Sequence, residues 1–155
     1  MNITQLSPGE NLIRTEGTLA FIEQGNLKEY DPAQRSRPAI ISFHASGETI
    51  ITRRHNQSHF IKAISPATIY QWQQSALDQL HQNYPELKNI YLALCASYDQ
   101  RISARSILIE LPPRNRIQLF RARHPQLIPY LKKKDIANYL HLNYTYLIDK
   151  WNLNA

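Results

Sequence analysis

The feature of this sequence that most constrains its fold is a change in the spacing of apolar residues near residue 74. Before that point, apolar residues come in short groups rich in β-branched side chains, and after it they recur about one helical turn apart. The first pattern is typical of strands and the second of amphipathic helices. The sequence therefore predicts a β-rich first half followed by a helical second half.

The first half has the spacing of a small antiparallel β structure. Its apolar groups, for example residues 19–22 and 39–41, are separated by turn-forming segments such as residues 24–26 and 45–47. Short strands at this spacing are typical of a barrel or a sandwich. With 155 residues, 43% of them apolar, the chain can form one compact unit or two small ones.

Prolines divide the second half into separate helices. A helix that starts near Ser75 ends before Pro85, which is a favoured first residue for the long helix that we expect over residues 85–110. The apolar stripe of the long helix consists of Leu87, Ile90, Tyr91, Leu94, Tyr98 and Ile102. This stripe could pack wholly on the barrel, or one edge of it could pair with the same helix of a second subunit, and the sequence favours neither arrangement.

Residues 111–155 have the spacing of a helix-turn-helix. A helix is expected over residues 114–123, and two short helices with a tight connection follow it. The first of these carries the small Ala137 where two helices can cross closely, and the second begins after Asn143, a suitable N-cap, and buries Leu147. Any pair of amphipathic helices could give the same spacing.

The basic charge of the chain is concentrated in its C-terminal part. Residues 1–100 carry 8 basic and 9 acidic side chains, whereas residues 101–155 carry 10 basic and 3 acidic ones. This asymmetry indicates a polyanion as the partner of the C-terminal part. A solvated basic surface without a partner is the alternative.

The sequence argues against a disulfide and against a membrane location. Cys95 is the only cysteine, and its apolar helical surroundings predict a buried structural role. The N-terminus lacks a basic segment followed by an apolar core, and no apolar run approaches the roughly 20 residues that span a bilayer. We therefore expect a cytoplasmic protein that does not contact membranes.

No motif for catalysis or metal binding stands out. The chain has no glycine-rich phosphate loop and no His-Glu-x-x-His motif. His44, His55 and His59 are irregularly spaced over a predicted loop and strand, so they imply no fixed metal geometry. We expect no enzyme activity, no catalytic residues, no cofactor and no metal ion.

Several segments along the chain match one known arrangement. They lie at residues 6–14, 19–30, 43–48, 75–87, 113–128 and 134–140, and they include a Gly-Glu turn before a strand and a Phe-Ile-Glu-x-Gly hairpin. Together they resemble the Crp/Fnr-type transcription regulators that are common in Bacteroidetes. The resemblance spans nearly the whole chain.

The resemblance implies an α+β fold with three parts. Residues 1–84 would form a cyclic-nucleotide-binding-like sensor domain, an antiparallel β-barrel or jelly roll. Residues 85–110 would form the long connecting helix through which a homodimer assembles. Residues 111–155 would form a helical helix-turn-helix domain that binds DNA and, because the chain stops at Ala155, lacks a wing.

The resemblance also places candidate ligand-binding residues. In family members that bind cyclic nucleotides, a Gly-Glu pair contacts the ribose and phosphate region, and Gly47 and Glu48 match it. An arginine followed by Ser or Thr grips the cyclic phosphate, but Gln57 and Ser58 stand at that position. Glutamine carries no charge and cannot form the bidentate fork of arginine. We therefore expect that the barrel does not bind cyclic AMP and that it senses an unidentified small molecule or none.

Candidate DNA-binding residues follow in the same way. Lys132, Lys133 and Lys134, just before the first helix of the motif, could hold backbone phosphates, whereas Asp149 on the second helix would repel them. The second helix offers Asn143, Tyr144, Thr145 and Lys150 to DNA, and His141 replaces the turn glycine of the family.

Two functions are consistent with these patterns. The first is a DNA-binding transcription regulator with a degenerate sensor barrel, which the charge asymmetry favours. The second is a protein-interaction module that descends from such a regulator and no longer binds specific DNA, which the substituted second helix favours. We rank the DNA-binding regulator first.

Overall fold

The computed structural model describes residues 1–154, and it consists of seven strands followed by five α-helices. The strands are β1 (Asn2–Leu6), β2 (Leu19–Gln24), β3 (Leu27–Asp31), β4 (Ala39–His44), β5 (Thr49–Ile51), β6 (Phe60–Ala63) and β7 (Ala67–Trp72). The helices are α1 (Gln74–Asn83), α2 (Leu87–Leu108), α3 (Pro113–Arg123), α4 (Lys133–Tyr139) and α5 (Tyr144–Trp151), with short 3₁₀ turns η1 (Ile128–Tyr130) and η2 (Asn152–Asn154). The predicted change from strands to helices is confirmed.

The strands form two antiparallel sheets that face each other. One sheet has the order β1-β7-β2-β5, and the other has the order β4-β3-β6. Their inner faces share a core of aliphatic side chains such as Ile22, Leu27, Ile61 and Ile69, all of which are fully buried. The predicted α+β class with antiparallel strands is confirmed.

The turn between β2 and β3 depends on Gly25. Its φ of +105° lies in the left-handed region, and an added Cβ would sit 2.6 Å from the carbonyl oxygen of Pro66. Only glycine tolerates both conditions, so this residue fixes the turn that carries the chain from β2 in one sheet to β3 in the other.

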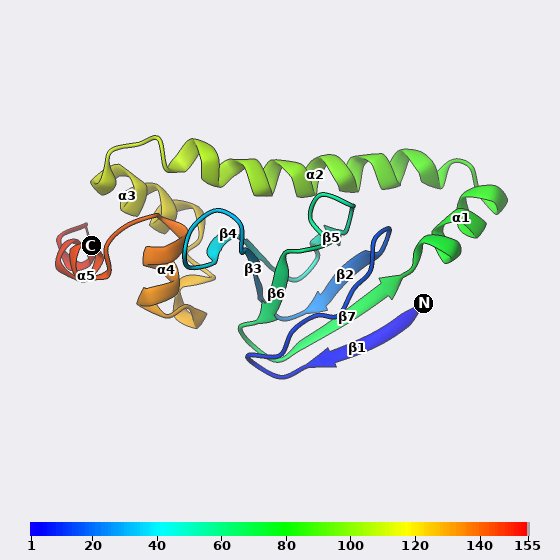
Figure 1. The fold of residues 1–155 in the computed structure, drawn as a ribbon, viewed down its shortest axis with the longest axis horizontal. Helices are drawn as coiled ribbons and strands as arrows, with labels where there is room; N and C mark the ends of the chain where they lie inside the picture. The colour runs from blue at the N-terminus through cyan, green and yellow to red at the C-terminus, as the bar shows by residue number, and fades with distance from the viewer. Residues whose placement is uncertain (155) are drawn as a thin grey trace.

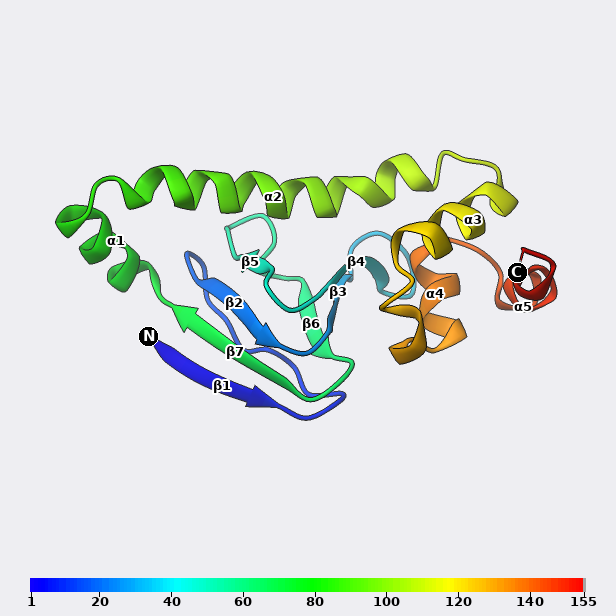
Figure 2. The same cartoon turned by 180° about the vertical axis from the view of Figure 1, so that it is seen from behind.

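Helix α2 lies along one side of the barrel and extends at its C-terminal end to the C-terminal helices (Figures 1 and 2). Tyr98 is buried against the barrel core, while Ile90, Leu92 and Ile107 are each more than half exposed. The predicted apolar stripe therefore packs on the barrel only in part, and a second apolar edge of the helix faces outward. Cys95, which we expected to be buried, is only partly buried against the same core.

Strand β4 lies between the barrel interior and the C-terminal helices, which explains why it is buried on both faces. All six of its residues are buried. Ile40 and Phe43 point to the C-terminal helices, where they join Ile117 and Phe120 of α3 and the buried residues of α4 and α5 in a second core. A strand covered on both faces has no solvent side on which polar residues would alternate.

The C-terminal helices begin as their sequence predicts, with one exception. Pro113 occupies the first turn of α3, and the Asn143 side chain caps α5 by accepting a hydrogen bond from the Thr145 amide at 2.8 Å. The prediction that all three lysines precede the first short helix is wrong, because α4 begins at Lys133. Contact with an aromatic ring of α5 offsets the unfavourable charge of Lys133 at this helix end.

Polar contacts fasten α4 to the barrel. The Asn138 side chain accepts hydrogen bonds from Arg35 (2.7 Å) and the Ile40 amide (2.8 Å) and donates one to the Pro38 carbonyl (3.0 Å). The Lys28 ammonium lies 2.7 Å from the Asp135 carboxylate. These contacts position α4 relative to the barrel.

Among residues 1–154, no helix combines the length and the apolar character that a bilayer span would need.

We expect Asn138→Ala to lower the free energy of unfolding by about 2 kcal/mol, because it leaves the partly buried Ile40 amide and Arg35 without their acceptor. Urea unfolding followed by circular dichroism measures this. Asn115→Ala, which removes an exposed amide from α3, is the control and should change stability by less than about 0.5 kcal/mol. Equal losses in the two variants would contradict the fastening role of Asn138.

Candidate functional site

The inside of the barrel holds a network of polar side chains around the buried carboxylate of Glu29. His44 Nε2 lies 2.9 Å from Glu29 Oε1, and His59 Nδ1 lies 2.7 Å from Oε2. The Tyr98 hydroxyl donates to the same carboxylate at 2.8 Å, and the Asn56 side chain donates to the Tyr98 oxygen at 3.1 Å. Glu29 and His44 are fully buried.

Four separate segments supply this network. Glu29 comes from β3, where the pairing with β4 shifts register between Glu29 and Tyr30, and His44 ends β4. Asn56 and His59 come from the loop between β5 and β6, and Tyr98 reaches in from the middle of α2. The network therefore joins strands β3 and β4, and the loop between β5 and β6, to the long helix α2.

The carboxylate of Glu29 is ionised in this setting. Burial alone would raise its pKa, but the hydrogen bonds from His44, His59 and Tyr98 outweigh burial and hold the pKa far below its ordinary value. Burial and the neighbouring Glu29 charge raise the pKa of Tyr98, so its hydroxyl keeps its proton and acts as a donor. The Arg14 guanidinium bonds the Asn56 carbonyl at 3.0 Å and adds a positive charge nearby.

The ligand residues expected from the sequence lie outside this network. Gly47 is an exposed turn residue, and Glu48 is ion-paired with Arg101 at 3.0 Å. Gln57 and Ser58 are exposed in the loop between β5 and β6. Within the described chain, no hydrogen bond or ion pair joins the Gly47-Glu48 pair to the Gln57-Ser58 pair.

The network residues themselves were missed by reasoning from the sequence. Of the three histidines that the sequence places close together, His55 is exposed and His44 lines a cavity, but the bonds of His44 and His59 to Glu29 were not foreseen. One sequence signal was available. Leu27 and Glu29 are two positions apart in a strand and therefore lie on the same, inward face. A carboxylate at such a position needs buried partners.

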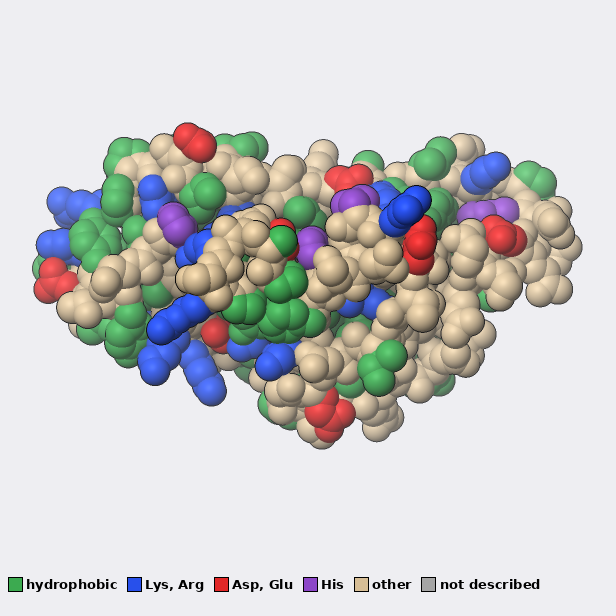
Figure 3. Space-filling view, in the orientation of Figure 1, with side chains coloured by type: hydrophobic (Ala, Val, Ile, Leu, Met, Phe, Trp, Pro, Cys, Tyr) green, Lys and Arg blue, Asp and Glu red, His purple; other side chains and the backbone are tan. Residues whose placement is uncertain are grey.

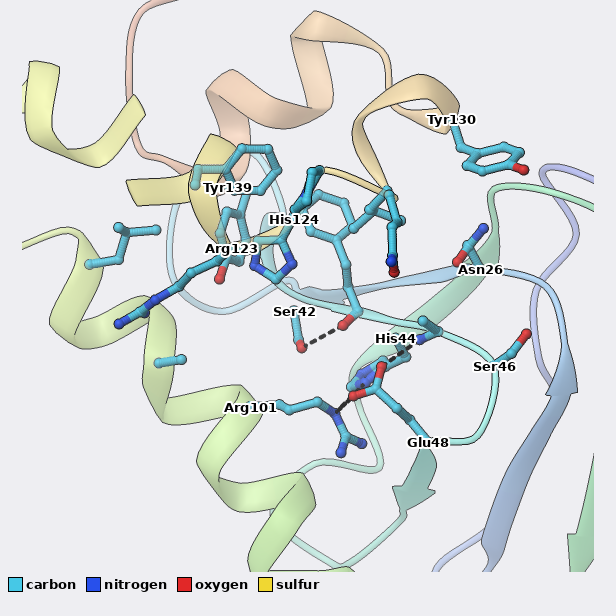
Figure 4. A pocket seen from close by; sticks show the side chains of 18 residues that line it. Asn26, Ser42, His44, Ser46, Glu48, Arg101, Arg123, His124, Tyr130 and Tyr139 are labelled. Carbon is cyan, nitrogen blue, oxygen red and sulfur yellow. Dashed lines mark hydrogen bonds and ion pairs between the residues drawn. The ribbon is translucent and has the colours of Figure 1, made fainter. Parts of the chain in front are cut away.

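A cavity of about 550 Å³ lies between the barrel and the C-terminal helices. Figure 4 shows Ser42, His44, Ser46 and Glu48 on its barrel side, and Arg101 reaching toward Glu48 from α2. Its opposite wall is formed by Arg123, His124, Tyr130 and Tyr139. Of the expected ligand residues, only Glu48 lines this cavity.

The end of the molecule that carries α3, α4 and α5 is rich in lysine and arginine (Figure 3). Lys132 and Lys134 are exposed there, whereas Lys133 is half-buried, with Nζ 4.4 Å from the centre of the Trp151 ring. Lys134 Nζ lies 6.0 Å from the Tyr144 ring centre. Two of the three lysines are therefore oriented by aromatic rings of α5.

A groove of about 580 Å³ runs beside the start of α5. Lys134, Asn143, Tyr144 and Thr145 line it, together with Arg35 and Arg37 from the loop between β3 and β4. Of the remaining expected residues, Lys150 lies 3.3 Å from the carboxylate of Asp149. This pairing offsets the negative charge that we expected to repel phosphate.

The turn between α4 and α5 has an unusual residue. His141 has a φ of 53°, a left-handed conformation that favours glycine. Arg35 bonds its Nδ1 at 2.9 Å, and burial together with Arg35, Arg105 and Arg116 lowers the pKa of the imidazole. The neutral ring can therefore accept a hydrogen bond from the Arg35 guanidinium at Nδ1, and this bond helps to stabilise the strained turn.

We expect Glu29→Gln to lower the free energy of unfolding at neutral pH by about 3 kcal/mol, because the buried histidines and Tyr98 lose their carboxylate. The pH dependence should change as well. The folded-state pKa of Glu29 lies below the ordinary value of 4.5, so its contribution is complete above that pH and is lost as the pH falls toward the folded-state pKa. The variant should lose less stability than the wild type between about pH 6 and pH 3.

Urea unfolding at the two pH values measures both effects. Glu23→Gln, which alters an exposed carboxylate on β2, is the control and should behave as the wild type. An unchanged pH dependence in Glu29→Gln would show that Glu29 does not carry this acid sensitivity.

No protein-family model matches the chain, and a search of curated proteins finds no match. Solved structures do match. FixK2 from Bradyrhizobium japonicum superposes with a TM-score of 0.79 at 13% identity, over 98% of this chain and 83% of FixK2. CLP from Xanthomonas campestris, a c-di-GMP responsive global regulator, superposes with a TM-score of 0.74 at 13% identity, over 99% of this chain and 87% of CLP.

A protein from Eubacterium rectale, described as a transcriptional regulator of the Crp/Fnr family, gives a TM-score of 0.74 at 12% identity, over 96% of this chain and 75% of that one. At these identities the likeness concerns the fold. The chain therefore has the fold of the Crp/Fnr transcription regulators, along nearly its whole length.

Proposed function

We propose that this protein is a DNA-binding transcription regulator of the Crp/Fnr type common in Bacteroidetes, in which α4 and α5 form the helix-turn-helix. The observation that carries the proposal is the groove beside α5. There, the expected phosphate contact Lys134 and the expected base contacts Asn143 and Thr145 line one surface together with Arg37. Polar donors and basic side chains around a short exposed helix suit the phosphates and base edges of DNA.

The proposed regulator is a homodimer that assembles through α2. The outer edge of this helix exposes Ala93, Ala96, Gln100, Ser103 and Ile107. These residues are spaced alternately by three and four positions, which is the spacing of a coiled-coil seam. Within residues 1–154, no other element lies on the outer side of α2 in Figures 1 and 2.

The proposed regulator does not bind cyclic AMP. Side chains from β3, β4 and α2 occupy the barrel interior, and their central group is the ionised Glu29. A carboxylate there would repel a cyclic phosphate, and Gln57, which stands where the family has arginine, is exposed and uncharged.

The test is binding to a random-sequence DNA duplex at about 50 and 200 mM salt. We expect binding by the wild type that weakens steeply with salt. Lys132→Ala/Lys134→Ala should weaken binding at low salt. The slope of the logarithm of the binding constant against the logarithm of the salt concentration should fall in magnitude by about 2, because the DNA releases roughly one counterion fewer for each lysine that is removed.

The matched control is Lys62→Ala/Lys88→Ala. It also removes two positive charges, one from an exposed lysine of α2 and one from a lysine stacked on an aromatic ring. This control should keep nearly the wild-type slope. If the wild type does not bind at low salt, the DNA-binding proposal fails and the protein-interaction function takes its place.

A further inference from the structure

We propose that the cavity between the barrel and the C-terminal helices is a binding site for a small organic anion that carries an aromatic ring. The cavity shares only His44 with the Glu29 network, and it shares no lining residue with the groove beside α5. Its volume of about 550 Å³ falls within the range of roughly 300–1,000 Å³ that is typical of small-molecule sites.

Charge on the cavity wall favours an anion. Arg101 and Arg123 line it, together with one carboxylate, Glu48. Glu48 is ion-paired with Arg101 at 3.0 Å and also accepts a hydrogen bond from the Ala45 amide at 2.7 Å. Arg123 is exposed and has no ion-pair partner among residues 1–154, so one positive charge on the wall remains uncompensated.

The floor of the cavity favours an aromatic ring. Phe43 and Tyr139 lie with ring centres 5.0 Å apart, and Phe120 lies 6.1 Å from Phe43 and 5.7 Å from Tyr139. The His124 ring centre is 5.0 Å from that of Phe120. These tilted rings form an aromatic surface against which a ligand ring can pack.

Polar groups at the edge can orient the ligand. Burial and the neighbouring Arg123 lower the pKa of His124, so its neutral imidazole offers one donor and one acceptor. Asn26 and Ser46 lie on the facing barrel side of the cavity (Figure 4). A few convergent polar groups above an apolar floor are the usual composition of a ligand site.

The position of the cavity suits a regulatory ligand. Its lining comes from β4, α2, α3 and α4, so a bound molecule would contact the barrel and the DNA-binding helices at once. The barrel interior itself is occupied by the Glu29 network. A ligand site in this cavity would take the place of a site in the barrel interior, which the Glu29 network fills. Ligand binding to the cavity does not depend on which DNA the protein binds.

The probe for the test is 8-anilinonaphthalene-1-sulfonate, an aromatic monoanion, and calorimetric titration into the full chain gives its affinity and stoichiometry. We expect one saturable site. Arg123→Gln removes the uncompensated charge, and Ala104→Trp fills the cavity from its α2 wall. Each variant should weaken binding by about tenfold or more. Arg114→Gln, an equal loss of charge at an exposed position on α3 outside the cavity, should bind as the wild type does.

Absence of saturable binding by the wild type would overturn the proposal. Wild-type affinity in a folded Ala104→Trp would overturn it as well, because the probe would then bind elsewhere. If Ala104→Trp does not fold, as judged by circular dichroism, Arg123→Gln decides the outcome, since its side chain is exposed and its loss leaves the packing unchanged. Equal affinity of Arg123→Gln and Arg114→Gln would then contradict an anion site.

Discussion

The barrel is organised around one buried carboxylate. A charge in an apolar interior is tolerated only when hydrogen-bonded partners surround it, and Glu29 therefore requires His44, His59 and Tyr98 to stay in place. Because these partners come from a different strand, a loop and α2, satisfying Glu29 fixes the loop between β5 and β6 and seats the long helix on the barrel. The interior is thereby filled by the protein's own side chains.

The same arrangement determines where the C-terminal helices lie. His44 points into the barrel from the end of β4, while Ile40 and Phe43 of that strand pack against the helices outside. One strand thus connects the Glu29 network to the second core, and Asn138 and Asp135 fasten α4 beside it. A change at the joint between barrel and helices would reach the proposed DNA-binding surface through this strand.

Local features of the fold could be predicted from the sequence, and features that depend on distant residues could not. The break at Pro85 and the cap at Asn143 follow from neighbouring residues alone, and the structure has both. The Glu29 network joins residues up to 69 positions apart, so no short motif announces it. The start of α4 at Lys133 was missed for a related reason, because the Trp151 ring that contacts this lysine lies one helix later.

In the proposed regulator, a barrel closed around Glu29 carries a DNA-binding surface formed by α4 and α5. Hydrogen–deuterium exchange of the wild-type protein, with and without a DNA duplex at low salt, is the first experiment to perform. If α4 and α5 bind DNA, exchange slows on DNA binding at residues 132–145 and stays unchanged in the barrel strands. Slower exchange confined to the barrel strands, or no change anywhere in the chain, would contradict the proposal.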